Sequence, residues 1–109
     1  MNSKKVVNIA GYRFIDLDDY AELRDPLLST CEDLGLKGTI LLSPNGINFS
    51  LAGDQESIDE YIVHLETDER FKKIPLKITY NAYQPFRRML VRLKKEIISL
   101  GREDIRPIE

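Results

Sequence analysis

The sequence has very few of the residues that usually perform chemistry. Its 109 residues include one cysteine, Cys31, one histidine, His64, and no tryptophan. A single cysteine excludes an internal disulfide, and neither a zinc cluster nor a Cys-x-x-Cys redox pair can be assembled from this set. We expect Cys31 to be a small buried hydrophobic residue and His64 to lie on a helix surface. No metal site and no catalytic residue is predicted in this chain.

Long hydrophobic runs and flexible linkers are also missing. The apolar runs are too short to span a membrane, and the start "MNSKKVVNIA" lacks the apolar segment and cleavage site of a signal peptide. No Gly/Ser/Pro-rich linker or repeat interrupts the chain. Hydrophobic residues make up 42% and charged residues 31%, as in ordinary globular proteins. These features predict one small domain in the cytosol.

Negative charge is absent from one long region, although the net charge is only −2. Residues 70–95 contain nine bases and no acid, whereas residues 16–33 contain seven acids and one base. Such asymmetry is typical of a surface that meets an anion, most commonly a nucleic-acid backbone. The alternative is that the two blocks neutralise each other across the fold.

The hydrophobic pattern predicts a strand and then a helix in the first third. The stretch "KKVVNIAGYRFIDL" is rich in β-branched and aromatic residues and is interpreted as a strand with an irregularity near Gly11. The residues assigned to this strand are Val7, Ile9, Tyr12 and Phe14. Helical spacing then follows at Tyr20, Leu23, Leu27, Cys31 and Leu34. Either Asp25 caps this helix with Pro26 in its first turn, or Pro26 kinks an earlier turn, and Gly35 ends it.

A hairpin, a second helix and another strand come next. "GTILLS" and "INFSLAG" flank the turn-forming residues Pro44, Asn45 and Gly46 and should pair antiparallel. Asp54 is expected to cap the second helix. The buried stripe of that helix is predicted to be Ile58, Tyr61, Ile62 and Leu65. "IPLKITYN" reads as a strand, with Leu76, Ile78 and Tyr80 pointing inward.

The predicted order is strand, helix, strand, strand, helix, strand. This is the β-α-β-β-α-β order of α+β ferredoxin-like folds, including acylphosphatase-like ones, in which an antiparallel sheet carries both helices on one face. The other face and the loops at its rim are natural places for binding. The segment "PFRRMLVRLKKEIISLG" also alternates and should form an extra C-terminal strand or arm. We expect this domain to span residues 1–100.

Two motifs carry a resemblance to a known family. "LKGTILLSPNGINFSLAG" together with "PFRRMLVRLKKEIISLG" resembles the N-terminal domain of the rhodanese-related tRNA wobble-uridine hydroxylases, formerly described as sulfurtransferases. Gly46, Ile47 and Asn48 match the turn of that family, while Asn45 stands where the family usually has glutamate. The second block matches at Arg92, Lys94, Lys95, Glu96, Ile97 and Gly101. The resemblance covers essentially the whole chain.

The resemblance implies a two-part enzyme. A rhodanese-like domain with the catalytic cysteine would follow, and residues 101–109 would begin the linker to it. The implied reaction is oxygen-dependent hydroxylation at carbon 5 of the wobble uridine, with molecular oxygen as co-substrate and the tRNA anticodon region as partner. The present chain alone is expected to catalyse nothing and to hold no cofactor, and Cys31 is not expected to be the nucleophile.

A two-part enzyme of this kind requires a basic surface that holds the polyanionic RNA while one base is presented to the separate catalytic domain. Phosphate contacts are predicted for Arg87, Arg88, Arg92, Lys94 and Lys95. The aromatic residues nearby could stack on bases or pack in the core or at the rim; these are Tyr80, Tyr83 and Phe86. The turn residues Asn45, Gly46 and Asn48 are predicted at a domain interface or active-site rim, although Asn45 and Gly46 also suit an ordinary tight turn.

Asn48 is less easily explained, because strands disfavour asparagine. Its side chain either satisfies the turn backbone or faces the pocket of a partner domain. An acylphosphatase-like enzyme is a second hypothesis, with Arg13 and Asn48 binding phosphate, but the following loop "IDLDD" would repel that anion. A third hypothesis is an interaction module whose open face docks onto the rhodanese-like half or a second copy. It predicts that Met89, Val91 and Leu93 are protected only when the second domain is present.

Overall fold

The computed structural model describes residues 5–97 as one five-stranded sheet with two α-helices. The strands are β1 (Val6–Phe14), β2 (Lys37–Ser43), β3 (Gly46–Gly53), β4 (Lys77–Asn81) and β5 (Met89–Leu93). The helices are α1 (Arg24–Asp33) and α2 (Gln55–Leu65), with short 3-10 turns η1 (Tyr20–Leu23) and η2 (Glu69–Phe71). No helix among these residues is long and apolar enough to cross a membrane. The predicted extension to 100 and the linker at 101–109 lie outside the described residues.

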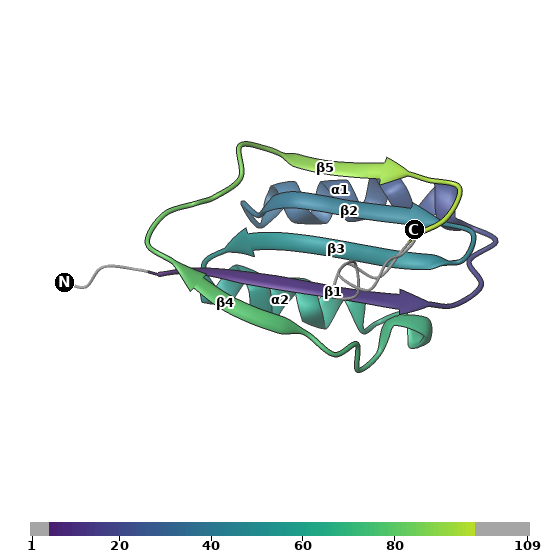
Figure 1. Cartoon of the computed structure of the whole chain (residues 1–109), viewed down its shortest axis with the longest axis horizontal. Coiled ribbons are helices and arrows are strands. Elements are labelled where there is room, and N and C mark those ends of the chain that lie inside the picture. Colours follow the sequence, from purple (N-terminus) through teal and green to yellow (C-terminus); the bar gives the residue numbers. More distant parts are fainter. Residues whose placement is uncertain (1–4, 98–109) are drawn as a thin grey trace, which may run out of the picture.

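The strand order is β4-β1-β3-β2-β5, and both helices lie on one face of the sheet (Figure 1). Neighbouring strands run antiparallel except β5, which runs parallel to β2. The α+β ferredoxin-like prediction is therefore confirmed, with the extra C-terminal segment added as an edge strand. Strands β4 and β5 follow one another in the sequence, yet they occupy opposite edges.

The hydrophobic core fills the space between the sheet and the helices. Phe49 of β3 and Tyr61 of α2 are almost fully buried there, with ring centroids 5.6 Å apart at an interplanar angle of 74°. Cys31 of α1 is also fully buried, and burial raises the pKa of its thiol to about 12. The prediction of a buried hydrophobic cysteine is confirmed, because the reactive thiolate is scarce at neutral pH. His64 is exposed on α2, as predicted.

Strand β1 is regular, so the irregularity predicted near Gly11 is wrong. Its pairing with β3 runs without a break from Val7 opposite Gly53 to Phe14 opposite Gly46. Simple alternation therefore holds, with Val7 facing the helices and Phe14 facing the uncovered side. Gly11 makes room for the core, because a Cβ there would lie 2.9 Å from Cζ of Phe49.

The helix ends follow their sequence signals with one exception. α1 begins at Arg24 after the 3-10 turn η1, so Asp25 is not the N-cap, while Pro26 does lie in the first turn. Gly35 ends α1 with φ of +74°, which suits glycine. Asp54 caps α2, because its carboxylate accepts a hydrogen bond of 2.9 Å from the Ser57 amide. Both of the latter predictions are confirmed.

The two edge strands differ in how well the helices cover them. On β4, Ile78 and Tyr80 are on the helical side, as predicted, but they remain 50% and 58% exposed. On β5 the register places Met89, Val91 and Leu93 on the side of α1, and Val91 is only 3% exposed. Met89 packs against the core, whereas Leu93 remains 43% exposed. The set faces α1 and not the open face, so the prediction that a second domain protects it at the open face is wrong.

Candidate nucleic-acid interface

The uncovered sheet face brings together side chains from all five strands. Register places Tyr12 beside Asn48, Asn48 beside Leu41, and Leu41 beside Arg92, which forms one row across β1, β3, β2 and β5. In the next row Lys77 of β4 lies beside Ala10 of β1. Residues that pair across neighbouring strands share a face, so these side chains all point away from the helices.

Charge is sorted between the two faces of the domain. Four charged residues lie within the five described strands: Arg13, Lys37, Lys77 and Arg92. Register turns Arg13 toward the helices and leaves the other three, all cationic, on the uncovered side. The helices hold the acids, which are Asp25, Glu32 and Asp33 on α1 and Glu56, Asp59 and Glu60 on α2. The uncovered face is therefore suited to bind an anion.

The five predicted phosphate-contacting residues lie along β5 and its flanks. Arg87, Arg88, Arg92, Lys94 and Lys95 are all exposed, and within residues 5–97 none forms an ion pair. Backbone hydrogen bonds hold both ends of this edge. The Arg88 carbonyl accepts one of 3.0 Å from Gly38, and the Lys94 amide donates one of 2.8 Å to Leu42. The structure thus brings these residues to one edge of the sheet.

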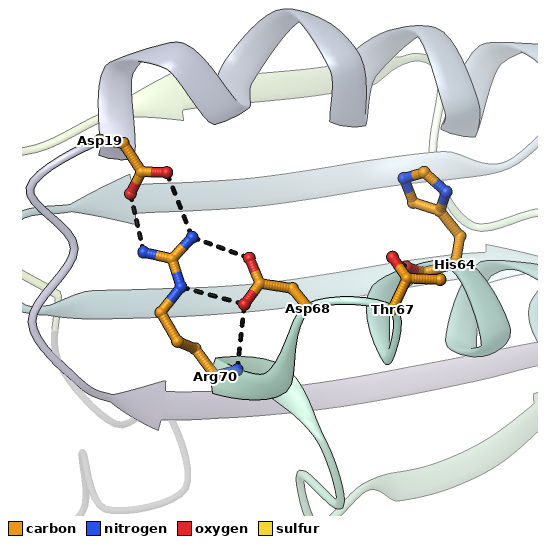
Figure 2. A network of polar contacts seen from close by, with 5 residues as sticks. All are labelled: Asp19, His64, Thr67, Asp68 and Arg70. Atoms are coloured by element: carbon orange, nitrogen blue, oxygen red, sulfur yellow. Dashed lines mark hydrogen bonds and ion pairs between the residues drawn. The ribbon is translucent and has the colours of Figure 1, made fainter.

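The rest of the basic block is partly neutralised. Arg70 donates to Asp19 at 2.8 and 3.1 Å and to the Asp68 carboxylate at 2.7 and 3.0 Å (Figure 2). Hydrogen bonds from this guanidinium hold the pKa values of Asp19 and Asp68 below 3.8, and its own pKa is raised by the same bonds. Lys72 pairs with Glu69 at 3.2 Å. The acidic and basic blocks of the sequence therefore do neutralise each other at Arg70, through its ion pair with Asp19.

The β2–β3 turn is a junction for three segments. The Asn45 side-chain oxygen accepts hydrogen bonds from the Ser43 hydroxyl and, at 3.1 Å, from the Ile97 amide. The carbonyls of Pro44 and Asn45 accept from Leu17 at 2.9 Å and from Ile15 at 3.0 Å. The turn therefore fixes the chain after β1 and the chain after β5. This geometry gives Asn45 a structural role.

Gly46 is required by close backbone packing. It has φ of +149°, and a Cβ at this position would lie 2.1 Å from the carbonyl oxygen of Arg13 and 2.9 Å from Cδ1 of Ile97. Glycine adopts this conformation without the penalty that L side chains incur. Two of the three residues predicted at an interface or active-site rim, Asn45 and Gly46, thus have a demonstrable structural function.

Asn48 differs from the two turn residues because it faces the uncovered side. It is only 3% exposed, and it lines a hollow of about 390 Å³. The other lining residues are Ala10, Gly11, Tyr12, Pro75, Leu76 and Lys77. Arg13 points to the opposite face, where it donates a hydrogen bond of 2.9 Å to the Lys72 carbonyl. Arg13 and Asn48 therefore cannot converge on one phosphate, so the acylphosphatase-like assignment of these two residues is wrong.

Two aromatic residues of this face were missed as binding candidates. Tyr12 and Phe14 are 37% and 52% exposed, and their rings meet edge to face with centroids 5.6 Å apart. Unbroken alternation from Val7 would have placed both on the uncovered side. Among the predicted aromatics, Tyr80 and Tyr83 are 58% and 72% exposed, so neither is a core residue.

Comparison with known proteins supports the same fold and a specific family. Residues 6–97 match the family described as "UPF0176 acylphosphatase like domain". The chain is 53% identical over 105 residues to a protein of Cupriavidus pinatubonensis named tRNA uridine(34) hydroxylase, covering 96% of this chain and 37% of that protein. It is 48% identical to a Bordetella avium protein of the same name, covering 94% of this chain and 42% of that protein. The chain thus spans well under half the length of these relatives.

Solved structures with little sequence similarity share the fold. BlrP1 of Klebsiella pneumoniae superposes with a TM-score of 0.65 at 19% identity, covering 84% of this chain and 24% of that one. Full-length HypF superposes with a TM-score of 0.58 at 9% identity, covering 85% of this chain and 13% of that one. At such identities the likeness concerns architecture alone.

Proposed function

Because the chain belongs to the UPF0176 acylphosphatase-like domain family, we propose that it is the N-terminal, tRNA-binding domain of a tRNA uridine(34) hydroxylase. One observation carries the binding role: every charged residue that the strands place on the uncovered sheet face is cationic. The acids of the helices lie on the other side. An RNA backbone can therefore approach the sheet without meeting a row of carboxylates.

Within this proposal the domain positions tRNA and the chemistry occurs elsewhere in the parent protein. A rhodanese-like domain would supply the catalytic cysteine, residues 101–109 would begin the linker to it, and molecular oxygen would be the co-substrate in the cytosol. The described part of the chain offers no comparable nucleophile, because Cys31 is buried with a raised pKa. The contribution of this domain is affinity and orientation of the anticodon region.

The edge formed by β5 carries cations before, within and after the strand, and these can contact phosphates. Arg87 and Arg88 precede the strand and Lys94 and Lys95 follow it, so Arg88 and Lys94 are six residues apart, or roughly 20 Å along an extended chain. Arg92 lies between them on the uncovered face. Cations spaced along a rigid edge match a polyanion that runs along it, and guanidinium groups can also stack on splayed bases.

Binding of tRNA measured as a function of salt tests this function. Replacing Arg92 and Lys94 together by glutamine should weaken binding and reduce the slope of log K against log salt by about 1.5, because each lost phosphate contact contributes about 0.7 to 0.9. The matched control replaces Lys72 and Lys73 by glutamine, which removes the same charge from the loop before β4. Equal slopes for the two double variants, or no salt-sensitive binding by the parent chain, would contradict the proposal and favour an interaction module.

A further inference from the structure

We propose that the hollow beside Tyr12 and Asn48 binds one unstacked nucleobase of single-stranded RNA. This inference rests on the proposed function, and it adds a base-binding site to a surface so far described by its phosphate contacts. The hollow lies on the uncovered face, between β1, β3 and the start of β4. It is distinct from the β5 edge, which lies at the other side of the sheet.

Shape favours a single planar group. The volume of about 390 Å³ is near the lower end of the range for small-molecule sites, which is roughly 300 to 1,000 Å³. Ala10 and Gly11 form part of its lining, and their small size leaves space over β1. A base that has left its stack can enter such a hollow, whereas a base pair inside a duplex cannot.

Aromatic rings supply the affinity that such a base needs. Tyr12 lines the hollow and Phe14 lies next to it on the same strand face, with the two rings edge to face. Both rings remain substantially exposed within residues 5–97. Bases stack on exposed aromatic side chains, and RNA recognition motif domains use aromatic residues on an open four-stranded sheet in this manner.

A cation beside the hollow matches the phosphate of a nucleotide. Asn48 also lines the hollow but is only 3% exposed, so contact with the base itself falls to the aromatic rings. Lys77 lines the same hollow and provides an ammonium group for a phosphate. Four strand spacings separate β4 from β5, or about 19 Å. A strand of RNA crossing the sheet can therefore contact Lys77 at one edge and Arg92 at the other.

A short single-stranded oligoribonucleotide containing one 2-aminopurine tests the site with the 109-residue chain. Stacking on an aromatic ring should quench the probe when the chain binds. Tyr12→Leu should weaken binding about tenfold or more and remove the quenching, because stacking on an aromatic contributes substantially to each bound base. Tyr12→Phe should retain both. The matched control is Tyr80→Leu, which removes an exposed tyrosine that the register places on the helical side of β4, and it should change neither.

A second variant separates the base site from general RNA affinity. Lys77→Gln should reduce the salt slope for the oligonucleotide by about 0.7 while quenching at saturation persists. Unchanged affinity and quenching in a folded Tyr12→Leu protein would overturn the base site and leave salt-sensitive tRNA binding at β5 intact. Loss of salt-sensitive tRNA binding in the unmodified chain would overturn the proposed function itself. Protection of Tyr12 by the remainder of a full-length relative without RNA would also overturn the site, by assigning the face to protein.

Discussion

The Ile97 amide donates a hydrogen bond of 3.1 Å to the side-chain oxygen of Asn45. These two residues are far apart in the sequence, and the bond closes the chain that follows β5 onto the β2–β3 turn. Because the Ser43 hydroxyl donates to the same oxygen, one carboxamide organises both the turn and the segment that leaves the sheet.

Removing this acceptor should loosen that segment. Asn45→Ala should lower the free energy of unfolding by about 1 to 2 kcal/mol, because two donors lose their partner. Asn45→Asp keeps an acceptor oxygen at the same place and should cost less. Urea titration measures the stability, and amide hydrogen exchange at Ile97 locates the effect. Unchanged protection of that amide in Asn45→Ala would contradict the role.

Gly46 should tolerate no side chain. Gly46→Ala would place a Cβ 2.1 Å from the Arg13 carbonyl oxygen at a φ of +149°, so β1 and β3 would have to separate. We expect a loss of about 2 kcal/mol or more. Gly35→Ala is the matched control, since it has positive φ but nothing within 4 Å, and it should cost about 1 to 2 kcal/mol. Thermal unfolding compares the two, and equal losses would refute the clash.

The Arg70 cluster predicts a pH-dependent contribution to stability. The pKa values of Asp19 and Asp68 are lowered in the folded protein, so their stabilisation is present above pH 4 and disappears as the pH falls through the folded values. Arg70→Met should reduce stability by about 1 kcal/mol at pH 7, since the side chains are about one-third exposed and solvent screens the pairs. The difference from the unmodified protein should shrink toward pH 2. Urea titrations across this range would show a constant gap if the ion pairs were irrelevant.

The Tyr61 hydroxyl has no hydrogen-bond partner within residues 5–97, although the side chain is fully buried. Burial raises the pKa of this phenol well above its usual value, so the group stays neutral. Tyr61→Phe keeps the ring that packs against Phe49 and removes the unsatisfied hydroxyl, and it should leave stability unchanged or raise it by about 1 kcal/mol. Tyr61→Leu should destabilise by loss of packing. Calorimetric unfolding of both variants checks the sign.

Local patterns predicted the elements of this domain well. Alternation in β5 indicated which residues share a face but not which face meets the helices. Asp54 and Gly35 marked helix ends that the structure confirms. The misassigned element was β1, where Gly11 suggested an irregularity that is not present. That error left Tyr12 and Phe14 without an assigned face, although unbroken alternation from Val7 turns both to the uncovered side.

Tertiary arrangement was less accessible from the sequence. Lys77 and Arg92 belong to one continuous basic block along the chain, yet the strand order places them at opposite edges of the sheet. Strand order depends on long-range pairing, which local periodicity does not encode. The Asn45 contact with Ile97 was hidden for the same reason, since 52 residues separate the two.

Acids on the helices and cations on the uncovered sheet face make residues 5–97 an electric dipole, which the net charge of −2 does not reveal. Such a dipole experiences a torque in the field of a polyanion, which turns the uncovered sheet face toward that polyanion before the two molecules collide. The association rate with RNA should then exceed the rate expected for a protein of the same small negative net charge. Added salt should lower this rate, because it screens the field that orients the domain.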